Sequence, residues 1–178
     1  MRKICTVCIV MIIVLAVLPG CQTKEVGTPR YEGKHLIIGM VGEVPELNKQ
    51  NVSFKPLSFS ELKELRASSD FDAVIITKEN LLEADDPAYS GIYKTSGIPF
   101  FFMESTKSYL PFVYDDLTYD DVPDLPAYSY ATGYFQEGDQ VQFWGFGLYN
   151  DELSKFSIED VYTQIFETVE SLITDDEN

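Results

Sequence analysis

Cysteine and histidine are scarce in this chain of 178 residues. All three cysteines lie within the first 21 residues, and His35 is the single histidine. Disulfide frameworks, thiol catalysis in the body of the chain, and zinc sites built from cysteines or several histidines are therefore excluded. The sequence also lacks G-x-S-x-G, G-x-x-x-x-G-K-[ST] and G-x-G-x-x-G, so nothing supports a serine-hydrolase elbow or a nucleotide-binding loop. We expect no cofactor.

Basic residues are also few. The chain has 13 Lys and Arg against 29 Asp and Glu, and its formal net charge is −16. Such a surface repels the phosphates of nucleic acids, so we expect no nucleic-acid partner. It repels anionic lipid as well, which means that no basic patch assists attachment to a membrane.

One long apolar run lies near the start of the chain. Arg2 and Lys3 give a basic beginning, residues 9–18 are apolar, and Pro19 and Gly20 follow. This three-part layout is typical of a secretory signal peptide, which we place at residues 1–20. The run is shorter than the roughly 20 apolar residues that a transmembrane helix needs.

The segment Leu18-Pro19-Gly20-Cys21 resembles the lipobox of bacterial lipoproteins, with Leu three positions before the cysteine and a small residue directly before it. The resemblance implies that the thiol of Cys21 receives a diacylglyceryl group and that cleavage makes Cys21 the N-terminus. The chain would then be lipid-anchored to the cell membrane and face its extracytoplasmic side. Pro19 departs from the Ala, Ser, Thr or Val that is usual in the family. An ordinary signal peptide or an uncleaved anchor helix is the alternative.

Cys5 and Cys8 form a C-x-x-C, the spacing of redox and metal sites. Both lie in the segment that cleavage would remove, so we assign them no redox role. Residues 21–34 are polar and contain Gly27, Pro29 and Gly33, which indicates a lipidated N-terminus followed by a flexible tether.

Three continuous apolar runs in the first half predict strands buried on both faces. They cover residues 35–41, 71–77 and 98–103, with helical patterns between them. This order is that of βαβ units, which form parallel sheets. The stretch from Asp70 to Ser105 resembles half of a Rossmann-like or flavodoxin-like domain, and its SGIPFFF is similar to a segment common in the lobes of periplasmic sugar-binding proteins.

The second half changes character. Residues 108–126, rich in Asp, Pro and Tyr, are expected to be irregular. Residues 128–135 and 141–149 predict a β-hairpin around a glycine-containing turn, and residues 157–174 predict a helix with one apolar face. We therefore predict a single α/β domain over residues 35–178, with a small, mostly parallel sheet, flanking helices, a C-terminal β-hairpin and a packing helix.

The first group of candidate ligand-binding residues follows the predicted parallel strands. Glu43, Thr77 and Glu104 each come after one of these strands, and open α/β sheets bind ligands outside the carboxyl ends of their strands. Glu43 and Glu104 together would form an acid and base pair. The alternative is that these residues form ordinary structural loops.

The second group of candidates lies in the predicted hairpin, which is rich in aromatic residues. Tyr134 and Trp144 represent this group, since aromatic rings beside carboxylates bind sugar rings or apolar ligands. We expect Tyr130, Thr132 and Tyr134 to share one face of their strand because strand side chains alternate. The alternative is that both faces of the hairpin are covered and its aromatic residues are core.

The densest run of carboxylates lies in the irregular segment. Calcium binding is one interpretation, because Ca²⁺ takes six to eight oxygen ligands. The D-x-[DN]-x-[DN]-G pattern is absent, however, and a solvated acidic loop is the preferred interpretation, so no metal site is predicted. The run comprises Asp115, Asp116, Asp120, Asp121 and Asp124.

These features favour a membrane-anchored extracytoplasmic lipoprotein that is a non-enzymatic accessory module and binds a small molecule or a protein. The alternative is an extracytoplasmic, carboxylate-dependent hydrolase that acts on sugar or cell-wall material. A third possibility is an anchored adaptor without a pocket. An enzyme requires two carboxylates close together in a concave pocket, a small-molecule binder requires an aromatic-lined pocket, and an adaptor requires an exposed apolar patch.

Overall fold

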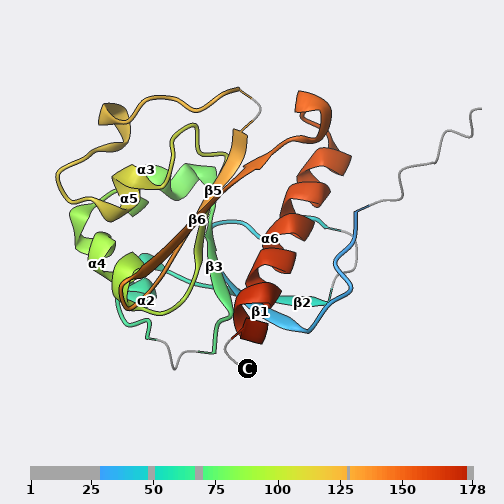
Figure 1. Cartoon of the computed structure of the whole chain (residues 1–178), viewed down its shortest axis with the longest axis horizontal. Helices are drawn as coiled ribbons and strands as arrows, with labels where there is room; N and C mark the ends of the chain where they lie inside the picture. The colour runs from blue at the N-terminus through green and yellow to red at the C-terminus, as the bar shows by residue number, and fades with distance from the viewer. Residues whose placement is uncertain (1–28, 48–50, 67–69, 128, 176–178) are drawn as a thin grey trace, which may run out of the picture.

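The computed structural model describes residues 29–47, 51–66, 70–127 and 129–175, which fold around one six-stranded sheet (Figure 1). The strands are β1 (Leu36–Val41), β2 (Val52–Pro56), β3 (Ala73–Ile76), β4 (Phe100–Met103), β5 (Ser129–Glu137) and β6 (Gln140–Gly147). Their order across the sheet is β2-β1-β3-β4-β5-β6. Neighbours among the first four strands pair in parallel, whereas β5 pairs antiparallel with both β4 and β6. The predicted α/β fold is confirmed.

The three central strands are buried because helices cover both faces of the sheet. Every residue of β3 and β4 is buried, and β1 is buried at all positions except Ile37. Successive strand residues point to opposite faces, so a strand covered on both sides requires apolar residues at every position. The register places Ile38 beside Ala73, and Ile76 beside Phe102. The three apolar runs thus form the parallel core, as predicted.

The helices divide unequally between the two faces (Figure 1). They are α2 (Phe59–Leu62), α3 (Leu81–Ala84), α4 (Pro87–Thr95), α5 (Leu110–Val113) and α6 (Lys155–Asp175), with short 3-10 turns η1 (Lys78–Asn80), η2 (Tyr119–Asp121) and η3 (Tyr149–Asp151). On one face, α6 buries Val161, Ile165 and Phe166 against the sheet. On the other face, α2 to α5 build a second core that includes Tyr93 and Phe112.

Two helices differ from expectation. The C-terminal helix begins at Lys155 rather than at Ser157, since the Ser154 hydroxyl accepts the Ser157 backbone N–H at 3.1 Å. The segment expected to be irregular contains α5, which has Pro111 in its first turn, where the missing N–H is not needed. Its Phe112 stacks on Phe102 of β4 at 3.7 Å between ring centroids. Packing on the sheet therefore stabilises a helix that is too short to form alone.

The β5–β6 hairpin forms as predicted, with one correction. Gly138 stands first in its turn with a φ of 56°, a conformation that glycine adopts without steric cost. A register shift between Ser129 and Ala131 marks a bulge. As a result Tyr130 joins the core under α6, while Tyr134 joins the opposite core. The prediction that Tyr130, Thr132 and Tyr134 share one face is wrong for Tyr130, because the bulge breaks the alternation.

Candidate functional site

Residues after β1 and β3 contact one another closely at the carboxyl ends of these strands. This is where the strand order reverses, the place where open α/β sheets bind ligands. Gly42 lies so close to Thr77 that a Cβ at position 42 would come within 2.0 Å of Thr77 Oγ1. The amide of Asn80 donates to the Val41 carbonyl at 3.3 Å and to Thr77 Oγ1 at 3.0 Å. Thr77 therefore has structural contacts, and Glu43, in the loop after β1, is exposed.

Glu104 occupies the neighbouring strand end in an unusual backbone conformation. Its φ is 52°, in the left-handed region that costs a non-glycine residue free energy. Its carboxylate pairs with the Lys78 ammonium at 3.5 Å. Burial, and then the nearby Glu104 carboxylate, raise the pKa of the Tyr130 phenol to about 12. This edge of the sheet brings Glu104 close to Lys78 and Tyr130.

The carboxylates of the acidic segment are directed to separate partners. Asp115 pairs with Lys94 at 3.7 Å, and Asp124 pairs with Lys107 at 3.0 Å. Asp121 caps η2 by accepting from Thr118. Within the described ranges, no three His, Cys, Asp or Glu side chains gather in a group that could hold a metal ion.

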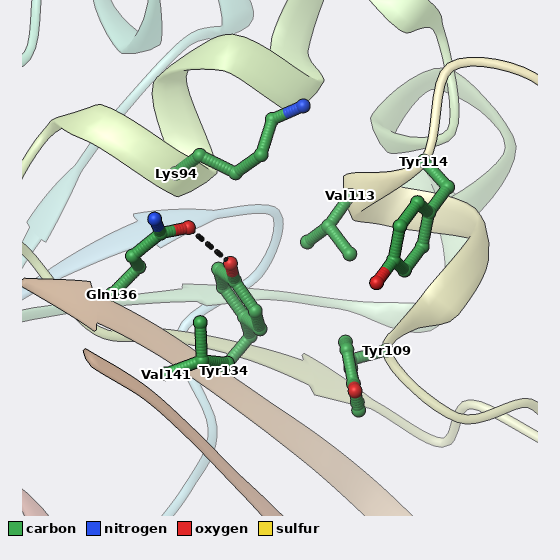
Figure 2. A pocket seen from close by; sticks show the side chains of 7 residues that line it. All are labelled: Lys94, Tyr109, Val113, Tyr114, Tyr134, Gln136 and Val141. Atoms are coloured by element: carbon green, nitrogen blue, oxygen red, sulfur yellow. Dashed lines mark hydrogen bonds between the residues drawn. The ribbon is translucent and has the colours of Figure 1, made fainter. Parts of the chain in front are cut away.

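An open pocket of about 160 Å³ lies between the hairpin and the two helices beside it (Figure 2). Helix α4 packs against both α5 and β5, and the pocket forms where these elements meet. Tyrosines form much of its wall, and one ammonium group lies at its border. The lining residues are Lys94 from α4, Tyr109, Val113 and Tyr114 from α5 and its ends, Tyr134 and Gln136 from β5, and Val141 from β6.

Three aromatic rings form a continuous stack along the pocket. Tyr109 lies between Tyr134, at 5.3 Å between ring centroids, and Phe143, at 4.9 Å, with interplanar angles of 27° and 28°. The stack runs from buried to exposed, since Tyr134 is 3% exposed and Phe143 is 61% exposed. Tyr114 is 50% exposed. Exposed aromatic rings beside a hollow are a feature of many ligand-binding sites.

Hydrogen bonds fix the polar end of the pocket (Figure 2). The Tyr134 hydroxyl donates to Gln136 Oε1 at 2.6 Å, and Gln136 Nε2 donates to the Gly138 carbonyl at 2.8 Å. Burial is the main cause that raises the pKa of both Tyr134 and Tyr109 above the ordinary value. Both phenols are therefore protonated at neutral pH and present O–H groups.

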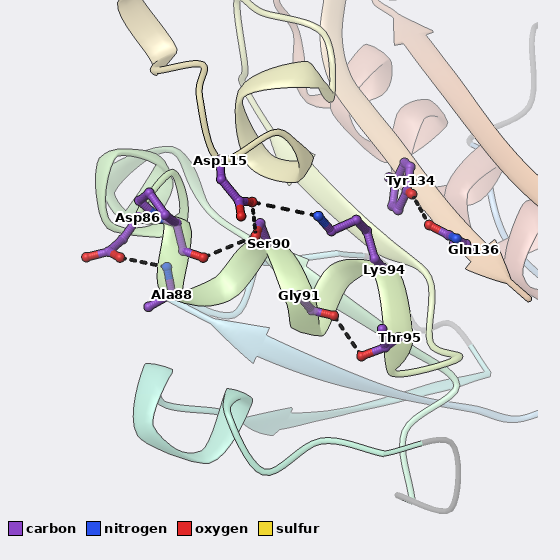
Figure 3. A network of polar contacts seen from close by, with 10 residues as sticks. Asp86, Ala88, Ser90, Gly91, Lys94, Thr95, Asp115, Tyr134 and Gln136 are labelled. Carbon is purple, nitrogen blue, oxygen red and sulfur yellow. Dashed lines mark hydrogen bonds and ion pairs between the residues drawn. The ribbon is translucent and has the colours of Figure 1, made fainter.

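Lys94 is held at the pocket border by a polar network that joins α4 to the segment after α5 (Figure 3). Its ammonium lies 3.7 Å from Asp115 Oδ1, and the Ser90 hydroxyl donates a short hydrogen bond to the same oxygen. The Ser90 hydroxyl, and then the Lys94 ammonium, hold the pKa of Asp115 below its usual value. Lys94 thus remains a positioned cation in a strongly acidic protein.

The five candidate residues do not form one site. Glu43, Thr77 and Glu104 lie at the strand ends, whereas Tyr134 lines the pocket. Trp144 lies on the opposite face of the hairpin, where its ring stacks on Phe101 at 6.0 Å between ring centroids. Tyr134 and Trp144 therefore do not contribute to the same pocket, and the prediction of Trp144 as a ligand-binding residue finds no support in this geometry.

The other six lining residues are not among the candidates predicted from the sequence. Two of them, Gln136 and Val141, could have been predicted from the hairpin register. In this register Gln136 pairs with Val141, and Tyr134 pairs with Phe143. Alternation from Tyr134 would have placed Gln136, Val141 and Phe143 on its face. Lys94 and the α5 residues gave no such signal, because they reach the pocket only through helix packing.

Comparisons of this chain with protein-family models, with curated proteins and with solved structures give no match. None of the helices in the part of the chain that the structure describes is long and apolar enough to cross a membrane.

Proposed function

We propose that the protein is a lipid-anchored, extracytoplasmic binding module whose binding site is the aromatic pocket between α4, α5 and the β5–β6 hairpin. The observation that carries the binding role is the pocket itself. It combines three tyrosines with one positioned cation, and an exposed ring, Phe143, extends its wall. Apolar walls with a few fixed polar groups are typical of ligand sites.

The anchor rests on Leu18-Pro19-Gly20-Cys21, which lies outside the described residues. Acyl chains on Cys21 would hold the chain on a membrane, because each buried CH₂ contributes about 0.8 kcal/mol. The acidic surface adds no attraction to anionic lipid, so the acyl chains would act alone.

Binding is favoured over hydrolysis by the chemistry of the two candidate regions. No carboxylate lines the aromatic pocket, so that pocket offers no acid and base pair. At the strand ends, Glu104 is paired with Lys78 rather than with a second carboxylate. The strained backbone of Glu104 is a feature that favours the hydrolase.

The pocket limits the size of what it can hold. A volume of about 160 Å³ is similar to that of an engineered apolar cavity of about 150 Å³ that binds one benzene molecule. It accommodates a single ring or one side chain, not a large cofactor. The tyrosine hydroxyls and the Gln136 amide would orient such a group, while the ring faces supply contact area.

Site-directed photo-crosslinking tests the binding role. The full chain is produced in bacterial cells as Phe143→p-benzoylphenylalanine and, as the control, as Leu82→p-benzoylphenylalanine. Leu82 is 76% exposed and is not a lining residue. After irradiation, intact mass spectrometry is expected to show a discrete adduct at position 143 and none at position 82. An unmodified mass at 143, or equal adducts at both positions, would contradict the proposal.

A further inference from the structure

Strand β6 leaves one row of backbone hydrogen-bonding groups without a neighbouring strand. It ends the sheet order of the described residues and lies in front of the other strands in Figure 1. Glu137 and Gln140 pair across the two-residue turn, so their N–H and C=O groups point to each other. Alternation along an antiparallel ladder then directs the backbone groups of Val141, Phe143 and Gly145 away from β5.

The sequence of this edge does not discourage pairing. Residues 140–147, QVQFWGFG, contain no charged residue and no proline, in a chain whose net charge is −16. The other edge strand, β2, carries Lys55 and Pro56, which are the kinds of residue that protect edges. Val141 and Phe143 are 46% and 61% exposed on β6. An edge with open backbone groups and exposed apolar side chains is a template for one more strand.

We propose that β6 binds an extended segment of a partner protein, which adds a seventh strand to the sheet and places one side chain in the aromatic pocket. This inference rests on the proposed function and names the class of its ligand. Side chains directly opposite on neighbouring strands lie on the same face. Residues of the partner beside Val141 and Phe143 therefore extend the stack of Tyr109 and Tyr134.

Charge selects the kind of partner. Acidic residues bracket the uncharged strand: Glu137 and Asp139 come just before it, and Asp151 and Glu152 follow it closely. A partner segment with apolar residues at alternate positions and Lys or Arg at its ends complements this edge. A second copy of this chain fits worse, because antiparallel pairing of two β6 strands brings the acidic ends of each copy toward those of the other.

Two synthetic peptide libraries test this inference. Both have six central positions that alternate between apolar residues (Val, Ile, Leu, Phe or Tyr) and Thr. One library carries Lys-Lys at both ends and the other Glu-Glu. The full chain in detergent micelles is expected to retain the Lys-flanked library and not the Glu-flanked one. Hydrogen–deuterium exchange is expected to slow in residues 140–147 when a retained peptide is bound.

A matched pair of variants at one position separates backbone pairing from other contacts. Gly145→Pro removes an outward backbone N–H, whereas Gly145→Ala keeps it. The alanine side chain fits at this position because an added Cβ meets nothing within 4 Å. We expect about a five-fold loss of peptide affinity for Gly145→Pro, the effect of one hydrogen bond, and little change for Gly145→Ala. If Gly145→Pro does not fold, Phe143→Lys replaces it as the test variant. It places a charge on the exposed edge and is expected to weaken binding of the same peptides.

The peptide-binding results decide whether β6 binds an extended segment. Retention of neither library, equal retention of both, or equal affinity of the Pro and Ala variants overturns the inference. Dimerisation of the chain that Gly145→Pro abolishes would assign the edge to a second copy instead. A photo-adduct at position 143 without any peptide binding would leave the proposed pocket function standing and remove only the extended-segment ligand.

Discussion

Among single residues, Gly42 approaches Thr77 closely at the strand ends. Its φ of 122° is rarely adopted by residues with side chains, and a Cβ there would lie 2.0 Å from Thr77 Oγ1. This close approach lies at the strand ends, where many α/β proteins hold a ligand. A side chain at position 42 would therefore displace Thr77 from its place at this edge of the sheet.

The role of Gly42 predicts a difference between two glycine substitutions. Gly42→Ala is expected to lower the free energy of unfolding by about 1–3 kcal/mol, because it forces strain and a clash. Gly91→Ala, at an exposed position of helix α4 with nothing within 4 Å of the added Cβ, is expected to raise it by about 0.5–1 kcal/mol. Urea unfolding followed by the fluorescence of Trp144, the single tryptophan, measures both. Equal stability of the two variants would contradict the packing at Gly42.

At the scale of elements, the parallel strands were predictable and the pocket was not. The runs that became β1, β3 and β4 are apolar at nearly every position, which is a local signal of burial on both faces. Helix α5 has four residues, and its packing on Phe102 cannot be read from local sequence. The bulge at Tyr130 likewise arises from pairing between strands. Only the β5 and β6 residues of the pocket could have been predicted from the sequence, through the alternation of side chains along the strand from Tyr134.

The network that joins α4 to the segment after α5 gives a pH-dependent prediction. The pKa of Asp115 is lowered in the folded state, so its contribution to stability is complete above its ordinary pKa of about 3.9 and is lost as pH falls through the lower folded value. Asp115→Asn is expected to lower the urea midpoint at pH 7 and to match the unsubstituted chain near pH 2. Asp116→Asn removes the same charge one residue away and is the control. A stability difference for Asp115→Asn that persists at pH 2 would contradict this role.

At the scale of the whole molecule, a net charge of −16 and an uncharged edge strand belong to the same surface. Repulsion between acidic molecules keeps the chain apart from its own copies, which reduces the aggregation risk that an unprotected edge creates. The same charge attracts a basic partner segment. Anchoring would concentrate the edge and the pocket at one membrane face, where a tethered partner meets them at a raised effective concentration.

The proposed lipid anchor on Cys21 would place the pocket outside the cell, and a comparison of cysteine variants tests it directly. Cells that produce the full chain, Cys21→Ala or Cys8→Ala are labelled with palmitate and fractionated. We predict that the full chain and Cys8→Ala incorporate label and sediment with membranes, whereas Cys21→Ala takes up no label and keeps its N-terminal segment. Label and processing that persist unchanged in Cys21→Ala would contradict the anchor.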